Sequence, residues 1–137
     1  MRRTDAPAIP VGADVTGAYD PVAEFQGEFA ELDFLSLANI DENAASAPLN
    51  GFLRPKVKSA KDYVLKNPKI EKMGLTFTTA VVDGVHYSFD GAFTVLDDFP
   101  NKPPAYDVVV LAGTLTKSRD GKSVAVTPVK FRYEAGG

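Results

Sequence analysis

The chain has 137 residues, 45% of them hydrophobic and 24% charged, with a net charge of −3 and no cysteine. This length suits a single domain with one core, and the absence of cysteine excludes disulfides, thiolate metal sites and a cysteine nucleophile. His86 is the only histidine, so a zinc site with several histidine ligands is also excluded.

Prolines and glycines interrupt residues 1–19, which predicts an extended or flexible arm ahead of a single domain over residues 20–137. Asp20-Pro21 is typical of a helix start, and apolar residues follow it at helical spacing as far as Leu32. We therefore predict a short helix from Asp20. A strand over residues 24–32 is the alternative, since Phe25 and Phe29 also share one strand face.

Loop-forming residues fill positions 38–56. The segment 57–66 then predicts a second short helix, in which Lys58 and Asp62 form a pair one turn apart. Asn67-Pro68 ends it, because the residue before a proline disfavours helical backbone.

From Leu75 onward the apolar period becomes two, which predicts two consecutive β-hairpins at 75–96 and 106–134. Asp83-Gly84 and Asp120-Gly121 suit the tight two-residue turns. The expected fold class is α+β, with one or two short helices packed on a bent antiparallel sheet of four to five strands.

The turn at Asp83-Gly84 implies a register for the first hairpin. In that register Thr78 faces Phe89, while Phe77 and Val81 share the opposite face with polar side chains of the next strand. This second face is half apolar, so we expect a helix, a partner or a ligand to cover it.

In the second hairpin the implied register pairs Gly113 with Pro128. The apolar side of the strands changes near this pair. Proline cannot donate to a sheet ladder, so we expect a bulge there that bends the sheet.

His86, Ser88 and Asp90 alternate along one strand and bring an imidazole, a hydroxyl and a carboxylate to one face. Alternate residues lie about 7 Å apart, whereas a catalytic base must come within about 3 Å of its nucleophile. These residues are therefore weak catalytic candidates, and a plain polar face is the favoured interpretation. Metal binding by the acids that flank the proline-rich loop (Asp97, Asp98 and Asp107) is disfavoured, because their spacing matches no EF-hand, and we expect neither a metal nor a cofactor.

Five aromatic residues of the hairpins are weak candidates for lining an apolar ligand pocket, and the alternative is that they form the core. They are Tyr87, Phe89, Phe93, Phe131 and Tyr133.

Charge is segregated along the chain. Eight acids and no base lie between Ala13 and Gly51, whereas Arg54 to Lys72 holds seven bases and two acids. Complementary blocks favour oriented contact between proteins, although they can equally pair within one domain. The candidate interaction surface comprises Arg54, Lys56, Lys58, Lys61, Lys66, Glu24, Glu28 and Glu31.

Three classes of function follow from these features. The first is a non-enzymatic assembly or interaction protein that associates with itself or with another protein. The second is a small-molecule-binding domain with an apolar pocket, and the third is a small cup-shaped enzyme that uses His86. Nucleic acid is disfavoured as a partner because the sequence pI is about 5.1. No apolar run approaches the roughly 20 residues that span a bilayer, and no signal peptide is recognised, so we expect a soluble, cytoplasmic protein.

Overall fold

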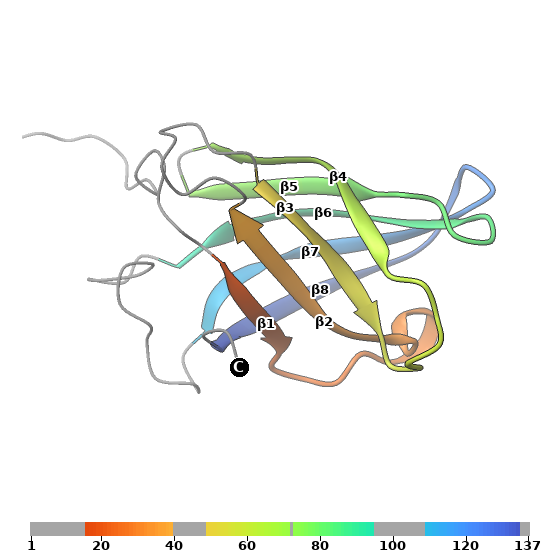
Figure 1. Cartoon of the computed structure of the whole chain (residues 1–137), viewed down its shortest axis with the longest axis horizontal. Helices are drawn as coiled ribbons and strands as arrows, with labels where there is room; N and C mark the ends of the chain where they lie inside the picture. Colours follow the sequence, from red (N-terminus) through yellow and green to blue (C-terminus); the bar gives the residue numbers. More distant parts are fainter. Residues whose placement is uncertain (1–15, 40–48, 72, 95–108, 135–137) are drawn as a thin grey trace, which may run out of the picture.

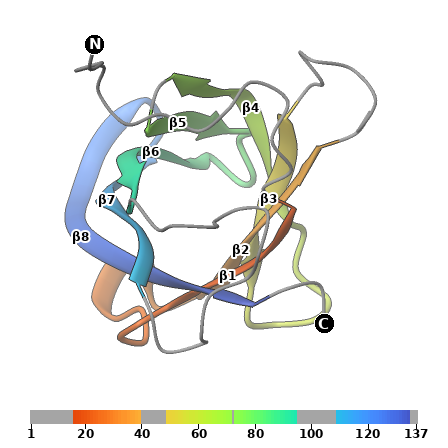
Figure 2. The ribbon, with the colours of Figure 1, turned by 90° about the vertical axis from the view of Figure 1, so that its left-hand side faces the viewer.

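Eight antiparallel strands close into a barrel in the computed structural model, which describes residues 16–39, 49–71, 73–94 and 109–134. Each strand pairs with its neighbours in sequence, and β8 returns to pair with β1 (Figure 1). Viewed along the other axis, the strands form a ring (Figure 2). Their bounds are β1 Gly17–Pro21, β2 Leu32–Asn39, β3 Leu49–Pro55, β4 Tyr63–Glu71, β5 Gly74–Thr79, β6 Val85–Phe93, β7 Val109–Arg119 and β8 Lys122–Glu134.

The expected α+β fold is therefore wrong, because the described residues contain no α-helix. Their only helical piece is η1, a three-residue 3-10 turn over Gly27–Phe29. Asp20-Pro21 ends β1 instead of opening a helix. The helical spacing of Phe25 and Phe29 arises because an irregular segment points both side chains into the barrel, where they are buried.

The second expected helix, over 57–66, is also wrong. Residues 57–62 form a turn, and β4 begins at Tyr63. Tyr63 and Leu65 are buried while Val64 and Lys66 are exposed, which is the alternation of a half-buried strand. Pairing with β3 and β5 thus overrides the local helical preference.

The two expected hairpins are confirmed. β5 and β6 are joined through Asp83-Gly84, and β7 and β8 through Asp120-Gly121. All four turn residues have positive φ, at 51° and 81° in the first turn and 52° and 82° in the second. This is the backbone that type I′ turns require.

The expected register of the first hairpin is wrong by one residue. Val82 pairs with Val85 as expected, but Thr78 then pairs with Ser88 instead of Phe89. An extra residue on the β5 side causes the shift, and Tyr87 donates its N–H to the side-chain oxygen of Thr79 at 3.0 Å in this region.

A one-residue shift exchanges the two faces of a strand. Phe77 therefore faces the interior, stacked on Phe89 with the ring centroids 5.4 Å apart. Val81 lies outside β5 and is 63% exposed. The half-apolar outer face expected for the first hairpin does not form, because Phe77 belongs to the core.

The second hairpin bends at places other than Gly113 and Pro128. Gly113 pairs with Val129, and regular pairing runs through this region. The register shifts lie between Lys117 and Ser118 and between Val109 and Leu111. Between these two irregularities, alternate residues of β7 and β8 face the barrel interior, and Lys117 is one of them.

Strands β6 and β7 approach very closely where Gly91 pairs with Gly113. A Cβ atom added to Gly113 would lie 2.5 Å from the carbonyl oxygen of Asp90 and 2.5 Å from the Cα of Gly91. Only glycine fits here, because the neighbouring atoms belong to the backbone.

The sequence predicts an extended or flexible arm over residues 1–19. In the structure β1 begins within this range, at Gly17, and Tyr19 is fully buried. Residues 1–15 lie outside the described residues. No helix among the described residues is long and apolar enough to cross a membrane.

Candidate functional site at the turn end of the barrel

One end of the barrel is built from the connections over residues 22–31, 56–62, 80–84 and 120–121, and we call it the turn end (Figure 1). Residues 22–31, the cap segment, link β1 to β2. Phe25 contacts Phe131, and Phe29 contacts Tyr87, with ring centroids 6.4 and 6.1 Å apart. The cap segment is thereby packed into the barrel by two aromatic side chains.

A polar cluster anchors the end of the cap segment. The Oε2 atom of Glu31 accepts hydrogen bonds from the hydroxyl of Tyr63 at 3.1 Å and from the hydroxyl of Tyr87 at 2.5 Å. The two tyrosine rings meet edge to face, with their centroids 4.9 Å apart. A single carboxylate oxygen therefore holds two phenols that come from different strands.

Lys117 joins this cluster from inside the barrel. It is only 7% exposed, and its Nζ donates to the backbone oxygen of Glu28 at 2.8 Å. The same ammonium lies 3.2 Å from Oε1 of Glu28 and 4.0 Å from Oε2 of Glu31. A buried ammonium requires such partners, since an unpaired one is costly.

Burial raises the pKa of Tyr87 well above its ordinary value, and the hydrogen bond to Glu31 and the charge of Glu31 raise it further. Burial is also the largest cause of the raised pKa of Tyr63, followed by the charge of Glu31 and the hydrogen bond to it. Both phenols are therefore neutral hydrogen-bond donors at physiological pH.

A cavity of about 370 Å³ borders the polar cluster at the turn end. Glu31 and Tyr63, two members of the polar cluster, form part of its lining. The other lining residues are Pro55, Ser59, Ala60, Lys61, Val81, Val82 and Asp83.

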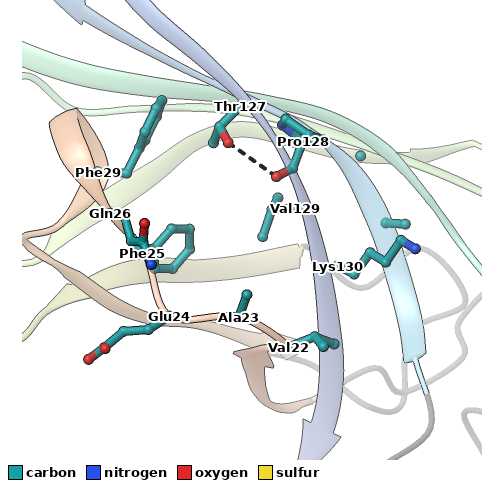
Figure 3. Close-up of a pocket in the computed structure, with 12 residues that line it drawn as sticks. Val22, Ala23, Glu24, Phe25, Gln26, Phe29, Thr127, Pro128, Val129 and Lys130 are labelled. Carbon is teal, nitrogen blue, oxygen red and sulfur yellow. Dashed lines mark hydrogen bonds between the residues drawn. The ribbon is translucent and has the colours of Figure 1, made fainter.

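A second hollow lies where β1 and β8 diverge. β1 pairs with β8 only from Ala18 opposite Glu134 to Pro21 opposite Phe131, and Val22 then donates its N–H to the oxygen of Lys130 at 2.8 Å. Toward the turn, β7 is the only strand that pairs with β8 in the described part of the chain. The adjoining groove has a volume of about 520 Å³ (Figure 3).

Figure 3 shows Phe25 and Phe29 on the cap-segment side of this groove, opposite Thr127 and Val129 of β8. The full lining is Val22, Ala23, Glu24, Phe25, Gln26, Phe29, Ala112, Gly113, Thr127, Pro128, Val129 and Lys130. The groove is therefore largely apolar, and its lining includes one acid (Glu24), one amide (Gln26) and one base (Lys130).

The backbone of β8 borders the groove without a neighbouring strand, and the carbonyl of Pro128 there accepts a hydrogen bond from the hydroxyl of Thr127 at 3.3 Å (Figure 3). Successive residues of a strand direct their N–H and C=O groups to alternate sides. Because the oxygen of Lys130 points to β1, the carbonyl of Pro128 and both backbone groups of Val126 point the same way. The backbone of Val126 has no strand partner on that side among the described residues. Proline suits such an edge, since it lacks an N–H.

The weak catalytic candidates His86, Ser88 and Asp90 lie on the outer face of β6, away from both hollows just described. Ser88 pairs with Thr78 and Thr116 across the sheet. Among the described residues no hydrogen bond joins the three candidates, and Ser88 and Asp90 border a shallow polar depression of about 490 Å³. The geometry lends no support to a catalytic role.

The five aromatic residues expected around a ligand pocket are all buried inside the barrel. They contact other rings: Phe89 meets Phe131, and both Phe93 and Tyr133 meet Tyr19. The space between them is therefore occupied by aromatic side chains, as the core interpretation requires.

The charged blocks pair within the chain at several points. Lys56 lies 3.1 Å from Glu24, and Arg54 lies 2.8 Å from Asp62. Glu28 and Glu31 pair with Lys117, and Arg119 lies 3.7 Å from Glu28. Lys58, Lys61 and Lys66 are exposed. Most of the expected interaction surface is thus engaged in contacts inside one molecule.

Lys117 and Tyr63 are not among the site residues predicted from the sequence, where Glu31 is only a candidate for the charged interaction surface. A signal for Lys117 was present, because it alternates with Gly113 and Leu115 at positions that face the interior. Nothing in the sequence marks the open edge of β8, since that edge depends on where β1 ends in space.

Among the described residues no group of three or more acidic or histidine side chains is placed to hold a metal. Asp97, Asp98 and Asp107 lie outside the described residues. No protein-family model, curated protein or solved structure matches the chain.

Proposed function

We propose that this protein is an interaction module that binds an extended segment of a partner protein along the open edge of β8. The observation that carries the proposal is the divergence of β1 from β8, which leaves strand backbone unpaired beside an apolar groove. Strand addition of this kind draws affinity from main-chain hydrogen bonds and specificity from pockets for alternate side chains.

The added segment lies antiparallel to β8, in the place that a longer β1 would take. It uses the N–H and C=O of Val126, whereas the C=O of Pro128 already accepts from the hydroxyl of Thr127. Every second side chain of the segment enters the groove between Phe25 and Val129 (Figure 3). An apolar side chain suits that position, because Phe25 and Val129 supply an apolar wall.

The charges beside the edge favour an acidic partner segment. Lys122 and Lys130 are both exposed and lie toward the two ends of the open stretch of β8. Two copies that paired antiparallel through this edge would bring Lys122 of one close to Lys130 of the other. Like charges at that spacing oppose self-pairing, and Pro128 weakens it further. The absence of cysteine supports a reducing compartment such as the cytoplasm as part of this proposal.

A small apolar ligand is the second candidate for the same groove. Its volume of about 520 Å³ falls in the range of ordinary ligand pockets, which is about 300–1,000 Å³. A hydrocarbon ligand would use Phe25, Phe29 and Val129 without needing the backbone of β8.

The test uses a capped hexapeptide of alternating glutamate and valine, titrated into the full chain by isothermal calorimetry. A hexapeptide of alternating lysine and valine is the charge control. We expect the acidic peptide to bind and the Val126→Pro variant, which removes an edge N–H, to weaken binding at least tenfold. The control variant is Val64→Thr, an exposed change on β4. A proline at position 64 is not a suitable control, because β4 is paired on both sides.

Equal binding of both peptides, or binding that Val126→Pro leaves unchanged, would overturn the proposal. Tight binding of the dye 8-anilinonaphthalene-1-sulfonate without any peptide binding would favour the small-ligand candidate. Light scattering at varied salt tests self-association, and a salt-sensitive dimer would replace the foreign partner with a second copy of the chain.

A further inference from the structure

The backbone N–H of Gly51 in β3 lies outside the ladder of the sheet. Successive residues of a strand direct their N–H groups to alternate sides, and the N–H of Lys56 donates to Glu31 on the β2 side. The N–H of Gly51 therefore points toward β4. In this direction along β3 the pairing with β4 ends at Phe52, so the N–H has no strand partner among the described residues. It donates instead to Oδ1 of Asn50 at 2.8 Å.

This hydrogen bond holds a nitrogen nucleophile beside a carbonyl carbon. Oδ1 is joined to Cγ by a bond of about 1.23 Å, so the nitrogen of Gly51 lies within about 4 Å of Cγ of Asn50. The torsion between Cβ and Cγ of an asparagine is soft, and rotation about it turns the carbonyl carbon toward the nitrogen. Asn50 is exposed, so water reaches its side-chain amide. Proximity of this kind accelerates an intramolecular attack.

The fold favours both residues of this pair. A Cβ atom on Gly51 would clash with the backbone oxygen of Ser36 in β2, so only glycine fits there. The side chain of Asn50 supplies the acceptor that β4 does not provide. Because glycine has no side chain, the attacking nitrogen is also unhindered. Packing and hydrogen bonding thus maintain the one Asn-Gly pair of the chain.

We propose that Asn50 is a site of spontaneous deamidation, with the backbone nitrogen of Gly51 as the nucleophile. The nitrogen bonds to Cγ of Asn50, the bond between Cγ and Nδ2 breaks, and the amide proton of Gly51 leaves with the ammonia. The product is a five-membered succinimide. Water, the only co-reactant, then opens the ring at one of its two carbonyl carbons and gives aspartate or isoaspartate at position 50.

The two products differ in their effect on β3. Aspartate keeps an acceptor for the N–H of Gly51 and adds one negative charge. Isoaspartate carries the main chain through the side-chain carbon, so it lengthens the backbone of β3 by one methylene and disturbs the pairing of position 50 with Ala38. None of these residues lines the groove beside β8, and the modification does not depend on the function proposed for that groove.

Incubation of the full chain at 37 °C and neutral pH tests the proposal. Mass spectrometry of fragments locates each conversion of an amide to an acid, and methyl transfer by an isoaspartyl methyltransferase detects isoaspartate. Asp90→Asn is the matched control, because it makes a second exposed Asn-Gly pair in β6, where Gly91 pairs with both neighbouring strands. In this variant we expect conversion at position 50 to be at least tenfold faster than at position 90.

Two further controls use the same measurement. Asn67 precedes Pro68, whose nitrogen has no proton to lose, so we expect no conversion there. The chain unfolded in guanidinium chloride gives the rate without the fold, and we expect the native rate at Asn50 to lie within tenfold of it. Equal rates at positions 50 and 90 of the variant, or a native rate more than tenfold below the unfolded rate, would overturn the proposal.

Discussion

The wall formed by β6 and β7 and the seam between β1 and β8 close the same barrel in different ways. β6 pairs with β7 along its whole length, from Val85 opposite Arg119 to Phe93 opposite Leu111. The seam joins only Ala18–Pro21 to Phe131–Glu134, and the cap segment begins where β1 ends. A complete ladder satisfies its own backbone, whereas the cap segment is held by side chains: Phe25 packs on Phe131, and Lys117 donates to the backbone oxygen of Glu28. The groove of about 520 Å³ lies beside the seam for this reason.

The largest expected difference between wall and seam is their tolerance of one methyl group. Gly113→Ala places a Cβ against the backbone of Asp90 and Gly91, and we expect a loss of about 3 kcal/mol in the free energy of unfolding. Gly27→Ala in the cap segment meets nothing within 4 Å, so it costs only the strain of a positive φ, about 1 kcal/mol. Urea denaturation measures both, and equal losses would show that the wall is no more rigid than the seam.

The polar anchor of the cap segment should have the next largest effect. Tyr87→Phe removes a 2.5 Å hydrogen bond to the carboxylate of Glu31, and bonds to charged groups contribute about 1.5–3 kcal/mol. Tyr133→Phe is the matched control, since its hydroxyl donates to the neutral backbone oxygen of Thr16 at 2.6 Å. Its expected cost is about 1 kcal/mol.

Hydrogen exchange separates the two tyrosine changes. We expect Tyr87→Phe to raise amide exchange within residues 22–31 and Tyr133→Phe to leave it unchanged there. Unchanged exchange in both variants would mean that Phe25 and Phe29 alone hold the cap segment.

Alkaline pH should also weaken the polar anchor of the cap segment. The expected loss in the free energy of unfolding per pH unit is smaller than the loss expected for Tyr87→Phe. The pKa of Tyr63 and of Tyr87 is raised in the folded protein above the ordinary value of 10.0. Above about pH 10 the unfolded chain has lost these protons while the folded chain keeps them. The stabilisation is therefore complete below pH 10 and is lost as pH rises above it, by up to about 1.4 kcal/mol per pH unit for each phenol.

Denaturation curves between pH 9 and 11 measure this slope, and a Tyr63→Phe/Tyr87→Phe double variant is the control. We expect the slope to be shallower in the double variant. Parallel slopes would show that the two phenols titrate normally in the folded chain.

The sequence was informative where structure is local. Asp83-Gly84 and Asp120-Gly121 specify tight turns through residues adjacent in sequence, and both hairpins are confirmed. Their registers were not predictable from the turns alone, because one extra residue beyond each turn shifts the pairing. Phe77 moved to the interior through such a shift.

The remaining strands depend on distant partners. Pro21 and Gly51 are poor strand formers by themselves, yet they lie in β1 and β3 because neighbouring strands pair with them. The same dependence hid the candidate sites. Glu31, Tyr63 and Lys117 are far apart in sequence, and only closure of the barrel brings them together.

The order of the strands has a consequence for how the barrel assembles. Every pairing except one joins consecutive strands, so β1 to β8 can zip together through contacts of short sequence separation, which form quickly. The exception is the seam, where Tyr19 meets Tyr133 and nearly the whole chain must be looped to close it. We therefore expect the seam to close last during folding and to open first in the native state, with an eight-stranded meander as the partly open form.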